Sequence, residues 1–282
     1  MSVKIICDSA SDITQKEAKE WDVIVLPLKT IWEGKEYQDG VSMEPQEFYE
    51  RLVETDELPT TSQVTPYEFE EAFRKVIENG DTAVCLTVSS KLSGTYQSAV
   101  IANEEVGYKV ELVDTLNVAL GENILVKRAI QLRDEGKSAS EIAQILQEEK
   151  EKVRLVALLD TLEYLKKGGR VSQTTAFAGT VLNIKPVVGI VDGVIEVLGK
   201  ARGSKNGNNK LIEQIQTAGG VDFSRPFVLG YSGLSDEILQ KYIKDSAHLY
   251  EGKTDNLPII TIGSSIGTHA GPGAIGVAFF SA

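Results

Sequence analysis

Serine and threonine residues gather at three places where an apolar, strand-like run gives way to a segment with helical character. These clusters are Asp8-Ser9, residues 60–62 (TTS) and residues 89–95 (SSKLSGT). In open α/β sheets, ligands bind beyond the carboxyl ends of the strands, and the hydroxyl and N–H groups at a helix N-terminus attract anions. The three clusters could therefore hold a carboxylate or a phosphate group.

Helix capping and turn formation offer another explanation for these hydroxyl groups, and they account for most serines in such positions. We favour this explanation for Ser9, Ser11 and Ser98. Thr61 and Ser93 are stronger candidates for ligand binding, because Ser93 precedes Gly94 and a glycine allows a ligand to approach the backbone closely.

Two short basic segments stand out in the second half of the sequence. Arg170 follows a pair of glycines, and Arg202 lies within residues 199–203 (GKARG), just after a predicted hairpin. An arginine so placed can bind an anion through two hydrogen bonds. The lysines before Arg170 need no ligand, because basic residues at a helix end already interact favourably with its dipole. The two arginines indicate a bound anion or an acidic partner.

The chain contains only two histidines, and one of them lies in a glycine-rich segment. His269 has glycines on both sides, so its backbone could approach a ligand, whereas His248 lies in a predicted helix. Ser93, His269 and Asp8 could form the triad of a stand-alone esterase. The sequence has no Gly-x-Ser-x-Gly elbow, which makes this alternative the weaker one, and it has neither a phosphate-binding P-loop nor a GxGxxG dinucleotide motif.

The composition is that of a globular protein with an acidic surface. The 282 residues carry a net charge of −12, and 42% of them are hydrophobic. Such a charge argues against nucleic-acid binding and against more than transient contact with anionic membranes. Cys7 and Cys85 lie in strand-like runs and are expected to be buried thiols of a cytoplasmic protein, without the spacing of a metal site.

Strands and helices alternate through the first half, which predicts an α/β fold with a mostly parallel sheet and flanking helices. The strands are predicted at residues 3–7, 21–29, 82–88 and 108–113. The second half mixes helices with antiparallel strands, so its sheet is expected to be mixed.

Three features of the second half are predicted more specifically. Residues 172–182 have the pattern of a helix, Asp192-Gly193 is expected to form the turn of a hairpin, and residues 263–273 are expected to form a glycine-rich loop. We place a boundary near Lys152, which predicts two α/β domains at residues 1–152 and 153–282.

Seven short motifs, in this order along the chain, resemble the signature of the DegV family of bacterial proteins. They are residues 8–12 (DSASD), 61–63 (TSQ), 89–99 (SSKLSGTYQSA), 165–172 (LKKGGRVS), 183–186 (NIKP), 199–203 (GKARG) and 269–274 (HAGPGA). Each motif alone is weakly specific, but the ordered set covers both halves of the chain and is highly specific.

The resemblance implies a lipid-binding protein that is not itself an enzyme. A long-chain fatty acid would lie between two α/β domains, with its acyl tail in an apolar tunnel largely within residues 153–282. Characterised members of the family present the carboxylate to a separate ATP-dependent fatty-acid kinase, which forms an acyl phosphate. No metal and no cofactor other than the fatty-acid ligand is implied.

The resemblance also assigns roles to individual residues. The ligands of the carboxylate would be Thr61, Ser93 with the backbone of Gly94, and His269. Arg170 and Arg202 would contact the phosphate or the kinase.

Two segments depart from the family pattern. Residues 64–66 read VTP, where the family often has a proline directly after Gln63. Residues 115–121 (TLNVALG) are more apolar than the serine-rich segment often found there, a difference that concerns the wall of the tunnel and its selectivity. A lipid sensor that serves no kinase is a further alternative.

Overall fold

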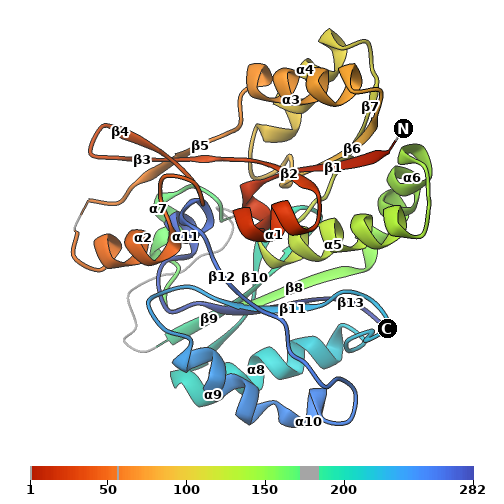
Figure 1. Cartoon of the computed structure of the whole chain (residues 1–282). Helices are drawn as coiled ribbons and strands as arrows, with labels where there is room; N and C mark the ends of the chain where they lie inside the picture. Colours follow the sequence, from red (N-terminus) through yellow and green to blue (C-terminus); the bar gives the residue numbers. More distant parts are fainter. Residues whose placement is uncertain (1, 56, 172–183) are drawn as a thin grey trace.

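The computed structural model describes residues 2–55, 57–171 and 184–282, and it has two main β-sheets that face each other across a central helix (Figure 1). The helix predicted at residues 172–182 lies outside this described part. Within the described residues, no helix is both long enough and apolar enough to cross a bilayer.

The first sheet is parallel throughout, as the alternation of strands and helices predicts. In spatial order its strands are β2 (Val23–Leu26), β1 (Val3–Asp8), β6 (Thr82–Thr87) and β7 (Val110–Asp114). Helices cover both faces of this sheet (Figure 1). They are α1 (Gln15–Glu20), α3 (Pro66–Glu78), α4 (Thr95–Glu105), α5 (Leu120–Asp134) and α6 (Ala139–Glu149).

The second sheet has six strands and is mixed, because β11 and β12 pair in parallel while the other neighbours are antiparallel. In spatial order its strands are β10 (Val194–Arg202), β9 (Ile184–Val191), β8 (Val153–Leu158), β13 (Ile275–Phe280), β11 (Val228–Tyr231) and β12 (Ile259–Thr261). On its outer face lie α8 (Gly203–Thr217), α9 (Glu237–Asp245) and α10 (Ala247–Tyr250) (Figure 1). The fold is therefore α/β with a parallel and a mixed sheet, as predicted.

The sequence did not predict a third, small antiparallel sheet. It consists of β4 (Lys35–Gln38), β3 (Lys29–Trp32) and β5 (Thr60–Ser62), and α2 (Pro45–Leu52) lies in the connection between β4 and β5. The strand expected at residues 21–29 is in fact β2 followed by the start of β3. The reason is that the chain leaves the parallel sheet after Leu26 to form this separate sheet.

The second correction concerns the glycine-rich segment near the C-terminus. Residues 263–273 were expected to be a loop, but Ser264–Ala270 form the helix α11. This helix packs against α2, β3 and β5, and also against α7 (Glu163–Lys167) and the short 3-10 helix η1 (Ser9–Ser11). Contacts with these elements, rather than helix propensity, hold α11 in place.

Helix α5 joins the two main sheets into one core. Most of its residues are buried, and it packs against strands of both sheets. Ile5 of the first sheet and Phe280 of the second belong to the same cluster of buried apolar side chains. The six-stranded sheet begins at Val153, after the short 3-10 helix η2 (Lys150–Lys152). The division into domains at this point stays a prediction.

Candidate functional site

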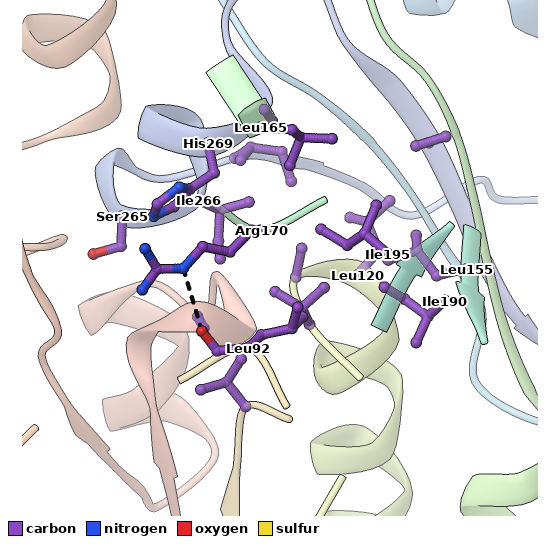
Figure 2. A pocket seen from close by; sticks show the side chains of 18 of the residues that line it. Leu92, Leu120, Leu155, Leu165, Arg170, Ile190, Ile195, Ser265, Ile266 and His269 are labelled. Carbon is purple, nitrogen blue, oxygen red and sulfur yellow. Dashed lines mark hydrogen bonds between the residues drawn. The ribbon is translucent and has the colours of Figure 1, made fainter. Parts of the chain in front are cut away.

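A cavity of about 430 Å³ lies between the two main sheets, and residues from both halves of the chain form its wall. One end is lined by aliphatic side chains, including Leu120, Leu155, Ile190 and Ile195 (Figure 2). Polar groups line the opposite end. This volume is within the ordinary range for small-molecule sites, and an apolar wall with few polar groups is their usual form.

Thr61 and His269 meet at the polar end although they lie far apart in the sequence. The hydroxyl of Thr61 on β5 and Nε2 of His269 on α11 are 2.9 Å apart, a hydrogen-bond distance. The small sheet positions Thr61. Strand β5 pairs with β3, and helix α11 packs against both strands. The structure thus brings together two residues that were predicted to share a ligand.

The imidazole of His269 is neutral at physiological pH. Burial lowers its pKa from 6.5 to about 4, and the nearby Arg170 guanidinium contributes to the same shift. Among the described residues its Nδ1 atom has no hydrogen-bond partner. Gly168 packs against this atom so closely that a Cβ there would lie 2.2 Å from it. In a neutral imidazole the protonated ring nitrogen donates a hydrogen bond, as an anionic head group would require, and the other nitrogen accepts one.

Ser93 and Gly94 contribute the start of helix α4 to the same cavity. The Ser93 hydroxyl lies 2.9 Å from the Thr95 hydroxyl and accepts a hydrogen bond from the Thr95 N–H at 3.3 Å. Gly94 is required for space, because a Cβ would lie 2.1 Å from the Gln63 side-chain oxygen. N–H groups at the start of an α-helix attract anions, so this corner suits a carboxylate.

Arg170 lines the cavity, whereas Arg202 does not. The guanidinium of Arg170 donates hydrogen bonds to the carbonyl oxygens of Leu92, at 3.3 Å, and of Gly168, at 2.6 Å. Figure 2 shows it between Leu92 and the α11 side chains. Arg202 is exposed at the end of β10. Its predicted contact with a phosphate or a kinase stays a prediction.

Ser265 is a polar cavity residue that was not predicted as a candidate. Its hydroxyl is buried and, within the described part of the chain, has no hydrogen-bond partner. Ser265 and His269 are four residues apart and so share a face of α11. The four-residue spacing is visible in the sequence. It predicts a shared face only in a helix, and this segment was expected to be a loop.

The hydrogen bonds of the polar end do not form a hydrolase triad. His269 pairs with Thr61, and Ser93 pairs with Thr95. The Asp8 carboxylate accepts hydrogen bonds from the N–H groups of Ala10 and Val88. Across residues 2–55, 57–171 and 184–282, no group of three or more histidine, cysteine or acidic residues could hold a metal ion. The arrangement is suited to holding an anionic head group.

Segment 115–121, the more apolar of the two departures from the family pattern, contributes to the apolar wall. Val118, Ala119 and Leu120 line the cavity, and Leu120 is the first residue of α5. The apolar composition of the segment therefore adds to the surface available to an aliphatic ligand.

Comparisons with known proteins agree on one family. The family model described as "Uncharacterised protein, DegV family" matches residues 2–282. A DegV domain-containing protein of Caldanaerobacter subterraneus subsp. tengcongensis is 35% identical over 280 residues, which cover 98% of each chain.

Solved structures show the same fold with related sequences. A fatty-acid-binding DegV family protein from Thermus thermophilus superposes with a TM-score of 0.89 and 31% identity over 100% of both chains. A stearic acid-binding protein from Eubacterium ventriosum superposes with a TM-score of 0.87 and 27% identity, covering 99% of this chain and 97% of that one.

Proposed function

The chain belongs to the DegV family, and from this premise we propose that it binds a long-chain fatty acid, with the acyl tail at the apolar end of the cavity and the carboxylate at the polar end. The observation that carries the proposal is the cavity itself, whose described residues form an aliphatic wall at one end and polar groups at the other. The solved relatives described as binding fatty acids support it.

The apolar and polar ends of the cavity contribute differently to the free energy of fatty-acid binding. Each buried methylene contributes about 0.8 kcal/mol, so a long acyl tail supplies most of the affinity. A hydrogen bond to a charged carboxylate contributes about 1.5–3 kcal/mol. Thr61, Ser93, the Gly94 backbone and His269 are proposed to make these bonds, and they fix the position of the chain in the cavity.

Ligand analysis tests the proposal directly. Mass spectrometry of lipid extracted from the purified protein should identify a C14 to C18 fatty acid, the range that the family resemblance suggests. After delipidation, the protein should bind palmitate more tightly than hexadecanol, because the alcohol has the same tail without the charge. The proposal would be contradicted if the purified protein contained no lipid and, after delipidation, bound neither palmitate nor hexadecanol.

We also propose that the bound carboxylate is presented to a separate ATP-dependent kinase in the cytoplasm, so that catalysis takes place in the partner. Arg170 at the polar end and the exposed Arg202 are the residues proposed to meet the phosphate or the kinase. Acyl phosphate should form only when a fatty-acid kinase, ATP and the loaded protein are all present.

Two outcomes would favour the alternatives. Hydrolysis of a chromogenic ester by this protein alone, abolished in Ser93→Ala, would indicate an esterase. Tight fatty-acid binding with no acyl phosphate formed by the kinase encoded in the same genome would indicate a lipid sensor.

A further inference from the structure

Asp39 is a buried acidic residue outside the cavity, and it is hydrogen-bonded to the helix that carries the polar cavity residues Ser265 and His269. It follows β4 and is 2% exposed. Its Oδ1 atom accepts hydrogen bonds from the backbone N–H and the hydroxyl of Ser264, both at 2.8 Å. Its Oδ2 atom accepts one from the Ser9 hydroxyl at 2.9 Å. Ser264 is the first residue of α11, so the carboxylate fixes the start of that helix.

A second set of contacts holds α11 against the small sheet. Thr30 on β3 and Thr61 on β5 are paired in register, so their side chains lie on the same face. The hydroxyl of Thr30 is 2.9 Å from that of Ser264 and, because the Ser264 hydrogen is directed at Asp39, Thr30 is the donor. Thr61 meets His269 near the other end of the helix.

Close packing leaves α11 little freedom to shift. The N–H of Gly263 donates to Oδ1 of Asp12 at 2.8 Å. A Cβ at Gly263 would lie 2.9 Å from Oδ1 of Asp39, and one at Gly267 would lie 2.6 Å from the Tyr49 hydroxyl. The helix is thus held between carboxylates at its start and α2 along its side.

From these contacts we propose that Asp39 is a positioning residue of the polar end of the cavity. Its carboxylate fixes α11, and α11 in turn holds His269 against Thr61 and Ser265 at the cavity wall. The acid-binding part of this inference rests on the proposed function, whereas the placement of His269 does not.

The histidines give a readout that is independent of any ligand. In the wild type, NMR of labelled imidazoles should show no titration of His269 between pH 5 and 8, because its pKa is about 4. In Asp39→Ala the freed helix admits water to the imidazole, and its pKa should move toward 6.5, into the observed range. His248, the other histidine of the chain, is the internal reference.

Two further variants separate positioning from loss of stability. Ser264→Ala removes the hydroxyl bonds to Asp39 and Thr30 while keeping the backbone bond, so it serves if Asp39→Ala does not fold. Asn103→Ala is the matched control, because Asn103 is 6% exposed and its amide bonds the Val110 backbone away from α11. It should leave the His269 titration as in the wild type.

The ligand readout compares palmitate with hexadecanol in each variant. Loss of positioning should reduce the preference for the acid by about 10- to 150-fold, the effect of one bond to a charged group, and leave alcohol binding nearly unchanged. An unaltered His269 titration in Asp39→Ala, or in Ser264→Ala if the first variant does not fold, would overturn the inference. Equal changes in Asn103→Ala would also overturn it. A wild type that binds neither compound would refute the proposed function, while the titration would still decide the role of Asp39.

Discussion

The position of His269 in a candidate ligand site could be predicted from the sequence, but its protonation state could not. Its glycine neighbours suggested a ligand-facing position, and the structure places it in the cavity wall. Its neutral state could not be predicted, because it arises from burial and from Arg170, which is distant in sequence. A neutral imidazole leaves the fixed positive charge of the polar end to arginine, so histidine and arginine have separate roles there.

Substitutions of Ser93 and Arg202 should have different effects on two steps, fatty-acid binding and kinase-coupled acyl phosphate formation. Ser93→Ala removes a cavity hydroxyl, so fatty-acid affinity should fall about 10- to 150-fold, and acyl phosphate formation should fall further because transfer depends on orientation. Arg202→Ala alters an exposed side chain outside the cavity wall, so binding should be unchanged while kinase-coupled formation decreases. Binding and coupled assays on each variant measure both steps.

Arg74 provides the control for the arginine variant. It is half exposed on α3 and pairs with Glu70 on the same helix. Arg74→Ala should change neither step. If Arg202→Ala abolished binding and left turnover per bound ligand intact, the proposed division of roles would be wrong.

At the scale of elements, the hairpin shows where local sequence was sufficient. The predicted turn at Asp192-Gly193 joins β9 to β10 in the structure. Both residues have positive φ, 49° and 81°, as a two-residue hairpin of this kind requires. The flanking Ile190 and Ile195 reach the cavity, so a turn readable from two residues positions part of its wall.

The small sheet and α11 show where local sequence was insufficient. The segment Ser264–Ala270 contains serines, a threonine and a glycine, which are poor helix formers. Contacts with Asp39, Thr30 and Thr61 stabilise it as a helix, and these residues lie more than 200 positions away. The strands of the small sheet have only three or four residues each, too few to show a clear alternating pattern.

The apolar end depends on the fit between α5 and two strands. Gly230 on β11 and Gly276 on β13 are paired in register, and a Cβ on them would lie 2.5 Å and 3.0 Å from the Leu120 side chain. Gly276→Ala should therefore push Leu120 into the cavity and favour shorter acids, at a cost of about 0.8 kcal/mol per methylene excluded. Leu120→Ala should have the opposite effect and favour longer acids.

Affinities for saturated acids from C12 to C20 measure both changes. Binding of the short acids should remain in Gly276→Ala, which serves as the internal control for folding. An optimum that stayed at the wild-type length in both variants would show that Leu120 does not limit the acyl chain.

At the scale of the whole molecule, the two sheets share one core through α5, and a group of buried carboxylates lies in the same interior. Asp8, Asp12, Asp39 and Glu122 are at most 8% exposed. Burial raises the pKa of each, and that of Asp8 reaches about 7. The alternating elements predicted the layers, but not this group, because Asp39 and Glu122 come from segments distant from Asp8 and Asp12 and the four residues look individually like turn or surface residues.

Glu122 allows the energetic effect of these carboxylates to be measured. Its pKa is raised well above the ordinary glutamate value by burial and by the nearby Asp8 carboxylate. Because the folded state keeps the proton to a higher pH than the unfolded state, its contribution to stability is present at low pH and is lost as pH rises. Each proton involved changes the free energy of unfolding by at most about 1.4 kcal/mol per pH unit.

Glu122→Gln should therefore stabilise the protein increasingly as pH rises above 4.5, the ordinary pKa of a glutamate. His269 also titrates as pH falls, since its folded pKa is about 4, but it is present in both proteins and its effect cancels in the difference between them. Thermal unfolding of wild type and variant at several pH values measures the difference. Glu104→Gln is the control, since it removes the same charge from an exposed position on α4. A stability difference that stayed constant with pH would mean that Glu122 ionises equally in the folded and unfolded chains, which its burial beside Asp8 makes physically costly.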